Sequence, residues 1–305
     1  MSAIAVRPQT IGDAELSSSD AAETVALWNG GTSYAEGDYA RSDVTHRIYR
    51  STAAANLGND PTDPANLYPA AGATWVEYGP TNAWAMFDDL NDTATSWTES
   101  GEVVLTPDYF DALGLYGLVG SSVRVRVNDG TSDVYDQTFD LVSAVGITDW
   151  YSWFFEYRGQ VKSLLLDDIP PVPNPIVTVT ITGATGTEVS IATLSLGRQL
   201  NIGETEFGLA LSFRDYSVFE EDDFGKFTVV QRGYSNRADA RLLIRNNRVD
   251  QIRDALLPYR ARPIFWGLTR NFKSTNFFGF FKRLDVEIAY PTHSLVTIQL
   301  WGTTE

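Results

Sequence analysis

The stretch "SVRVRVNDGTSDVYD" (residues 122–136) predicts a β-hairpin in the middle of the chain. Val123, Val125 and Val127 alternate with polar residues, so they lie on one face of a strand. Asp129-Gly130 is typical of the tight turn between two antiparallel strands. Downstream, "IVTVTIT" (176–182) alternates in the same way. Strands of this kind, joined by turns, predict a β-sandwich of the jelly-roll type over residues 81–200.

The sequence before this sandwich is dense in turn-forming residues. "LWNGGTSYAEGDYARSDVTHRIYRS" (27–51) combines aromatic residues with short apolar runs, and the same character continues to residue 80. This composition predicts a small all-β domain over residues 23–80. Residues 1–22 are expected to form an N-terminal arm.

The last third of the chain differs in charge and in pattern. Residues 1–200 carry 9 Lys+Arg against 26 Asp+Glu, whereas residues 201–305 carry 14 against 13. Strand patterns at 208–213, 226–232, 262–268 and 294–301 surround one helical pattern, "NNRVDQIRDALLPYR" (246–260). We therefore expect an α+β domain with one main helix over residues 201–305, in a chain that is mainly β.

The composition excludes several classes of function. The chain has no cysteine, which excludes disulfides, thiolate metal sites and a cysteine nucleophile. Its acidic first two thirds disfavour nucleic acid. No stretch approaches the roughly 20 apolar residues of a membrane span, and the N-terminus lacks the pattern of a secretory signal. We expect neither nucleic-acid binding nor membrane insertion.

The sequence offers little for catalysis. His46 and His293 are the two histidines, and they fall in different predicted domains. The chain has no Gly-rich phosphate loop and no metal-binding histidine spacing, so we expect no enzymatic activity, no cofactor and no metal. "DDLNDT" (88–93) could ligate calcium through its oxygens, but it lacks the spacing and the glycine of an EF-hand loop. Solvated turn residues are the alternative interpretation.

The small domain resembles the chitin- and cellulose-binding modules of carbohydrate-binding families 5 and 12. The resemblance rests on Trp28, Tyr34 with Gly37-Asp38, Tyr49, and Trp75 in "ATWVEYGP". It implies sugar binding by exposed aromatic faces, with Trp28, Tyr34, Tyr68 and Trp75 as candidates. The alternative is that so small a domain needs its large aromatic residues as a core, which would leave it a framework or docking role.

A wider resemblance covers most of the chain. The segments "GPTNAWAMFDDLNDTATSW" (79–97), "DWYSWFF" (149–155), "DIPPVPNPIVTVTITG" (168–183) and residues 204–244 are similar to tail proteins of bacteriophages. The resemblance implies a structural component of the tail tip or baseplate, assembled in the host cytoplasm with other tail proteins and copies of itself, and able to contact host glycans. A receptor-binding protein that grips a glycan through Tyr68 or the sandwich rim, and a glycan depolymerase, are the alternatives.

Two groups of residues suggest an assembly interface. The first is a series of arginines: Arg237, Arg241, Arg245 and Arg248. Arginine pairs well with carboxylates at protein interfaces, although ordinary surface arginines are an equal alternative. The second is "NFFGFF", whose Phe277, Phe278, Phe280 and Phe281 exceed what one strand face can hide, so we expect a subunit interface there. "WYSWFFEY" (150–157) predicts a strand that is buried on both faces.

Overall fold

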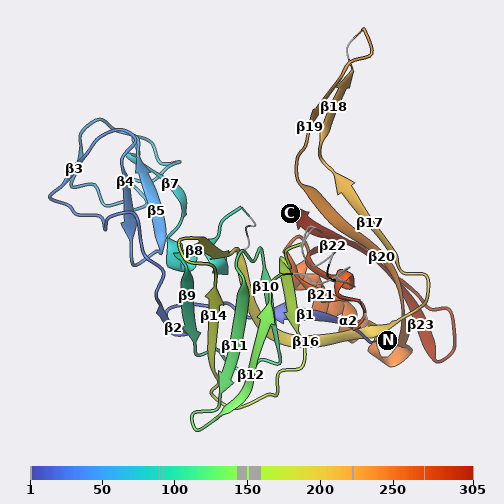
Figure 1. Ribbon diagram of the computed structural model, residues 1–305. Helices are drawn as coiled ribbons and strands as arrows, with labels where there is room; N and C mark the ends of the chain where they lie inside the picture. Colours follow the sequence, from blue (N-terminus) through green and yellow to red (C-terminus); the bar gives the residue numbers. More distant parts are fainter. Residues whose placement is uncertain are drawn as a thin grey trace.

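The computed structural model describes residues 2–88, 90, 92–142, 150, 159–221, 223–270 and 272–304. The chain is mainly β, and its strand ladders are antiparallel. Figure 1 shows a small β-module in blue, a β-sandwich in green and a C-terminal part in orange and red that holds the main helix of the described residues, α2 (Val249–Leu256). The predicted fold class is confirmed.

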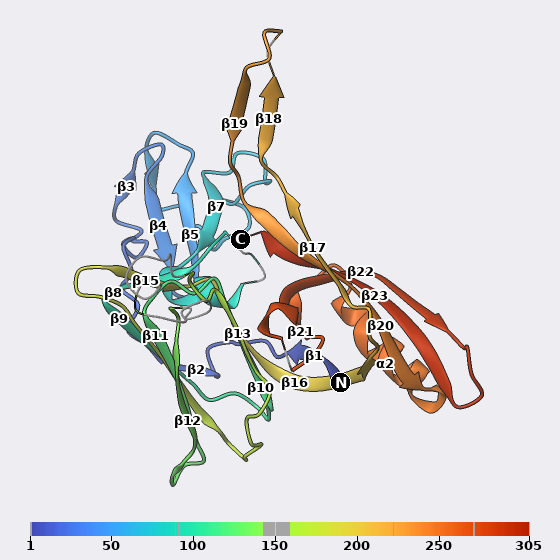
Figure 2. The same ribbon diagram turned by 45° about the vertical axis from the view of Figure 1, so that its right-hand side comes forward.

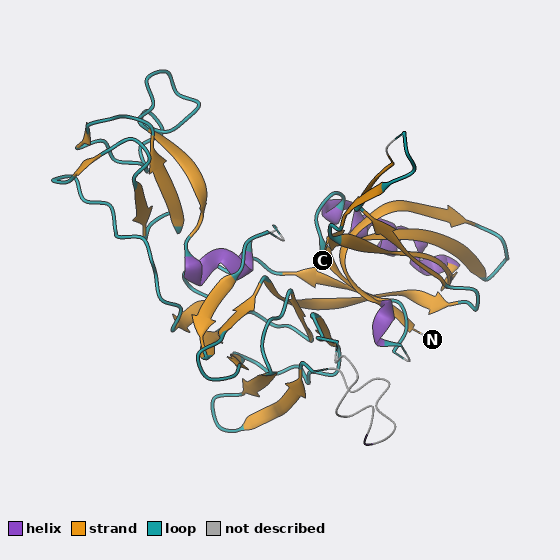
Figure 3. Ribbon diagram, turned by 45° about the horizontal axis from the view of Figure 1, so that its top comes forward, coloured by secondary structure: helices purple, strands orange, loops and turns teal. Residues whose placement is uncertain are grey.

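The module is built from short strands. Its three-stranded sheet has the order β4-β5-β7, and β3 pairs with β6. The strands are β3 (Ser33–Tyr34), β4 (Tyr39–Ser42), β5 (Arg47–Ser51), β6 (Asn56–Leu57) and β7 (Trp75–Pro80). The 3-10 helix η1 (Asn82–Phe87) follows β7 and leads into the sandwich. In Figure 3 the module stands at one side of the chain, next to η1.

One layer of the sandwich is a five-stranded sheet with the order β12-β11-β14-β9-β2. Its strands are β2 (Leu16–Ser19), β9 (Ser100–Leu105), β11 (Ser122–Asn128), β12 (Asp133–Asp140) and β14 (Ile176–Thr182). The predicted hairpin is confirmed as β11 and β12, and its turn is closed by the Asp129 amide, which donates to the Ser132 carbonyl over 3.1 Å. Val123, Val125 and Val127 are fully buried, as the alternation predicts.

The opposite layer comes from one end of a nine-stranded sheet, whose order is β13-β10-β16-β1-β21-β22-β23-β20-β17. At this end lie β10 (Ala112–Tyr116), β13 (Ser163–Leu166) and the start of β16 (Thr193–Thr205), beside the pair of β8 (Thr95–Thr98) and β15 (Glu188–Ile191). Leu113, Leu115, Leu194 and Leu196 meet the inward valines of the five-stranded sheet in one core. Two apolar faces packed in this way bury the alternating residues of both layers.

The rest of the nine-stranded sheet curls into a barrel-like domain. A further pairing of β16 with β20 joins Glu204 to Leu243 and Thr205 to Leu242, which closes β16, β1, β21, β22, β23 and β20 into a ring. The strands not yet bounded are β1 (Ser2–Pro8), β20 (Tyr234–Arg245), β21 (Ile264–Gly267), β22 (Asn276–Glu287) and β23 (His293–Thr304). The predicted helix forms as η2 (Asn246–Arg248), α2 and η3 (Leu257–Tyr259), and the short helix η4 (Lys273–Thr275) precedes β22. Ile252 and Leu256 of α2 are buried in the core of the barrel.

A β-arm extends from the barrel. It consists of β17 (Ala210–Asp215), which pairs with the start of β20, and of the hairpin β18 (Val218–Glu221) and β19 (Phe227–Val230). Figures 1 and 2 show the hairpin projecting away from the module, the sandwich and the barrel. We call residues 207–234 the arm.

The structure places the predicted boundaries differently. Residues 1–22 are not a free arm, because they contain β1 inside the nine-stranded sheet and β2 at the edge of the sandwich. Residue 200 lies within β16, which pairs first with β10 and then with β1 and β20. The sandwich and the barrel therefore share a strand. Of the predicted strand at 150–157, residues 151–157 lie outside the described residues.

Candidate functional site

The aromatic residues that carry the module's resemblance form its core. Tyr34 and Trp75 are buried with Tyr49, and their rings meet edge to face with centroids 5.1 Å apart. The indole N–H of Trp75 donates to the Asn59 carbonyl over 2.8 Å, and the Tyr34 hydroxyl accepts from the Asn29 amide over 2.9 Å. Because Trp75 is fully buried and Tyr34 nearly so, neither can stack on a sugar, and their proposed binding role is wrong.

The other two candidates lie apart from this pair. Trp28 is half-buried and packs against the same core. Tyr68 is 70% exposed, so it alone of the four candidates presents most of its side chain to solvent. Sequence reasoning did not single out Tyr39 and Tyr78, which are exposed and lie edge to face on β4 and β7 with centroids 4.9 Å apart. The module thus has exposed tyrosines rather than an exposed tryptophan among its described residues.

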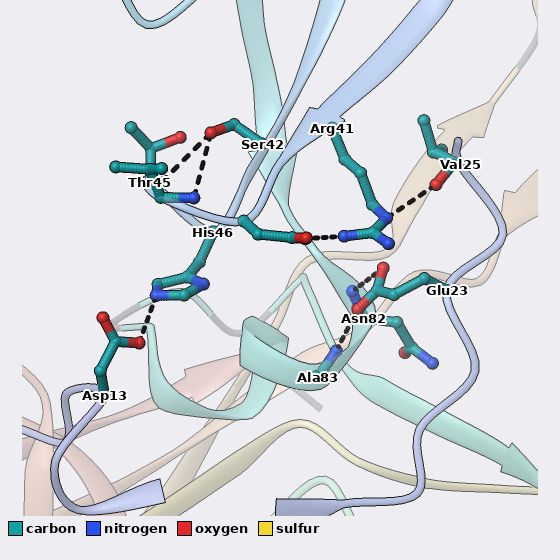
Figure 4. Close-up of polar contacts among 11 residues, drawn as sticks. Asp13, Glu23, Val25, Arg41, Ser42, Thr45, His46, Asn82 and Ala83 are labelled. Carbon is teal, nitrogen blue, oxygen red and sulfur yellow. Dashed lines mark hydrogen bonds and ion pairs between the residues drawn. The ribbon is translucent and has the colours of Figure 1, made fainter. Parts of the chain in front are cut away.

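The junction between the module and the sandwich is held by polar contacts (Figure 4). Glu23 accepts hydrogen bonds from the amides of Asn82 and Ala83, at 3.1 and 2.9 Å, and so caps the start of η1. His46 Nε2 lies 2.7 Å from a carboxylate oxygen of Asp13. The His46 ring stacks on the Trp84 ring of η1, with ring centroids 4.0 Å apart. These contacts fix how the module leaves the sandwich.

The histidines occupy structural positions. His46 is held between Asp13 and Trp84, and His293 Nδ1 lies 2.8 Å from the Thr292 hydroxyl. Within the described part of the chain, no serine hydroxyl hydrogen-bonds to either ring. This arrangement does not provide the nucleophile and base of a hydrolase triad.

The loop "DDLNDT" (88–93), for which calcium ligation and solvated turn residues were the two interpretations, is partly outside the described residues, since Asp89 and Asn91 are not described. Asp88 accepts hydrogen bonds from the Leu90 amide and the Thr93 hydroxyl, and burial raises the pKa of Asp88. Its carboxylate therefore organises its own loop. Among the described residues, no three His, Asp or Glu side chains are placed to hold a metal ion together.

A cleft of about 420 Å³ separates the sandwich from the barrel. At its rim the Tyr135 hydroxyl donates to Asp168 over 3.2 Å, and burial together with this carboxylate raises the pKa of Tyr135. Arg270, which follows β21, pairs with Asp167, which follows β13, at 2.6 Å. These polar groups are engaged with each other, and the pair of Arg270 and Asp167 links the barrel to the sandwich across the cleft.

The phenylalanines of "NFFGFF" do not form a free surface. Phe277 and Phe278 are 5% and 4% exposed on opposite faces of β22, and they enter two different cores. Phe281 is half-buried against Trp266, with centroids 5.9 Å apart, and Phe280 is also half-buried. The predicted subunit interface is wrong for Phe277 and Phe278, because the monomer covers both faces of this strand by itself.

The four arginines predicted for an assembly interface lie on two elements. Three of them are spaced four residues apart on the outer face of β20: Arg237, Arg241 and Arg245. The Arg237 guanidinium stacks over the Trp301 ring, 4.2 Å from its centroid. Arg248 lies in η2, where it donates to the Asn201 carbonyl over 2.7 Å. Arg241 and Arg245 are exposed, and no hydrogen bond or ion pair ties their side chains to another described residue. Two of the four arginines are therefore available to a partner.

A group of exposed apolar residues lies on the arm, which sequence reasoning did not identify as an interface. Every residue of β17 and β19 is exposed, and so are three of the four residues of β18. Ten large apolar or aromatic side chains of the arm are at least 38% exposed: Phe207, Leu211, Phe213, Tyr216, Phe219, Phe224, Phe227, Val229, Val230 and Tyr234. The close spacing of phenylalanines in residues 207–227 is the signal that could have pointed to it.

No protein-family model, no curated protein and no solved structure matches this chain. None of the described helices has the length and hydropathy of a membrane crossing. The function is therefore inferred from the resemblance in sequence and from the surfaces described above.

Proposed function

We propose that this chain is a structural subunit of a bacteriophage tail tip or baseplate, located in the virion. The arm is the single observation that supports this most. An apolar surface of this extent on a projecting element is typical of a site for protein–protein contact. A subunit that is incomplete until it meets its neighbours is the behaviour expected of an assembly component.

The described polar groups that stand out electrostatically serve as contacts within the fold. The titratable groups with shifted pKa values, such as Tyr135 and Asp88, are engaged in contacts that hold loops or domains. A catalytic group needs a free, positioned acid, base or nucleophile beside a site for substrate. These engaged groups do not favour the glycan depolymerase.

A second candidate function is host attachment through the module. The exposed side chains of Tyr39, Tyr68 and Tyr78 favour it, because aromatic rings can pack against the apolar face of a sugar. Many copies on one particle would give avidity even if each contact were weak. Binding of the full chain to a glycan array, lost in Tyr68→Ala, would support this candidate.

Localisation in the particle tests the structural proposal. Virions of the phage that encodes this chain should contain it in stoichiometric amounts by mass spectrometry, and antibodies against the module should label the tail tip in electron micrographs. Antibodies against the capsid serve as the control for labelling. Complete absence of the chain from purified virions would refute the proposal.

A further inference from the structure

We propose that the arm of one copy docks on the outer face of the barrel of a second copy, in a head-to-tail arrangement. The acceptor is the part of that face formed by β20 and β23, with Arg241 and Arg245 as its exposed cations. This inference deepens the proposed assembly function, on which it rests, by naming the partner of the arm.

The arm has the area of an interface. Its five phenylalanines are 63% to 97% exposed, and aromatic side chains of this kind present together on the order of 600–1000 Å². A standard protein–protein interface buries about 800 Å² on each partner. The arm alone can therefore supply one side of a stable contact.

The arm also has little packing of its own to stabilise it. The hairpin β18–β19 is two-stranded, and none of its eight residues is buried. An isolated two-stranded hairpin is marginally stable in water. In addition, β17 is the edge strand of the nine-stranded sheet, so its outer backbone groups are open to pairing. A partner protein could cover the exposed side chains of the hairpin and pair with the free backbone edge of β17.

The apolar surface of the arm continues an inner face of the barrel sheet. Leu211 stands opposite Ala238 and Phe213 opposite Asn236, so that both lie on the face of β20 that bears its buried residues. On the hairpin, Phe219 and Val229 are directly paired. The arm thus carries a core-type face out into solvent.

Charge identifies the surface that this arm fits. Near its tip the arm bears Glu220, Glu221 and Asp223, which are all exposed, together with Lys226. Glu221 is paired with Phe227 and shares the face of Phe219 and Val229. An interface that covers this face has to receive the Glu221 carboxylate as well. Arginine is the cation best suited to this, because its planar fork pairs with carboxylates in a bidentate way.

The outer face of the barrel provides the matching pattern. Arg241 and Arg245 flank Leu243 on β20, and Leu243 stands opposite the half-buried Leu295 of β23. Further along the same face, Trp301 lies under Arg237 and Lys282. The face also carries Asp239, Asp285 and Glu287, of which Asp285 already pairs with Arg283. Apolar residues with free arginines beside them complement an apolar arm with an acidic tip.

The charges disfavour one mode of self-contact. If two arms packed in parallel with their tips together, the acidic tips would repel each other. Docking of an arm on another copy's arginines avoids this repulsion and uses one arm and one acceptor face of each copy. Such head-to-tail contacts form a closed ring when the rotation between neighbours closes, and a filament when it does not.

A charge-swap experiment on the full chain tests this inference. The arm variant Glu220→Lys/Glu221→Lys and the face variant Arg241→Glu/Arg245→Glu should each weaken self-association about tenfold or more, measured by sedimentation velocity over a range of concentrations. The chain with all four substitutions should regain association. A fourth variant, Phe219→Ser/Val229→Ser, should weaken association without lowering the melting temperature, because both residues are exposed.

The outcomes separate this inference from the proposed function. A wild-type chain that remains monomeric at high concentration overturns the inference, and so does a fourfold variant that fails to recover. Capture of a different virion protein by the arm, without self-association, also overturns it. Each of these results leaves the proposed function standing if the chain is found in the tail. Conversely, a self-associating chain that is absent from virions would refute the proposed function alone.

Discussion

Replacement of Trp75 by alanine should unfold the module without unfolding the rest of the chain. Trp75 is fully buried and donates its indole N–H to the Asn59 carbonyl. Loss of a buried tryptophan costs about 3–5 kcal/mol, and the lost hydrogen bond adds about 1 kcal/mol. A domain of about sixty residues has a total stability of roughly 3–9 kcal/mol. The substitution therefore removes much or all of the free energy that keeps the module folded.

Differential scanning calorimetry of the full chain measures this effect. The Trp75→Ala variant should show a separate early transition, or none, for the module, while the main transition of the sandwich and barrel stays in place. Limited proteolysis should then cut within residues 23–80. Tyr68→Ala is the matched control, because this side chain is 70% exposed and surface substitutions change stability by about 0.5 kcal/mol or less. A Trp75→Ala variant that melts like the wild type and loses only glycan binding would refute the assignment of Trp75 to the core.

Three further substitutions or titrations test other parts of the structure. Gly114→Ala would place a methyl group against the ring of Phe265, so the free energy of unfolding, measured with urea, should fall by about 1–3 kcal/mol. Gly79→Ala is the control, because its methyl group meets open space and should change stability little. Glu23→Ala removes the acceptor of two amides of η1 and should raise their hydrogen-exchange rates; protection unchanged from wild type would contradict the capping role. Backbone amides of the turn between β11 and β12 donate to the Asp129 carboxylate and hold its pKa below the ordinary value. The contribution of Asp129 to the stability of the hairpin is therefore complete above the ordinary aspartate pKa, and it is lost as the pH falls through the lower folded pKa. An NMR titration midpoint for Asp129 at or above the ordinary value would contradict this.

The alternating strands could be predicted from the sequence because one of their faces is buried. Val123, Val125 and Val127 follow this rule, and so do the residues of β14. Residues 2–8 do not, because Ala3 to Val6 are buried on both faces of β1. Their neighbours are β16 and β21, about two hundred residues or more away in sequence. A short apolar run carries no information about such distant pairing, so the sequence predicts only an N-terminal extension over these residues.

The module's candidate site was limited by a different ambiguity. An aromatic residue in a small domain can serve either as core or as a platform for a ligand, and sequence alone gives the residue type without its exposure. The core alternative for Trp28, Tyr34 and Trp75 was recognised from the size of the domain, and burial supports it. The exposed pair of Tyr39 and Tyr78 depends on the register of β4, β5 and β7, which no local pattern specifies.

The two phenylalanine-rich segments show why aromatic content alone does not locate an interface. In β22, Phe277 and Phe278 point to opposite faces and both are buried, because β22 lies in the interior of the nine-stranded sheet and each face meets its own core. On the arm, Phe213 lies on an edge strand and Phe219 on a two-stranded hairpin, and no second layer of the described residues covers them. The position in the sheet therefore decides which segment is free. Because the same chain buries Phe277 and Phe278 on both faces of β22, the exposure of the phenylalanines on the arm does not follow from a general excess of apolar residues. It follows from their position on an edge strand and on a two-stranded hairpin, and it is the basis of the proposed contact.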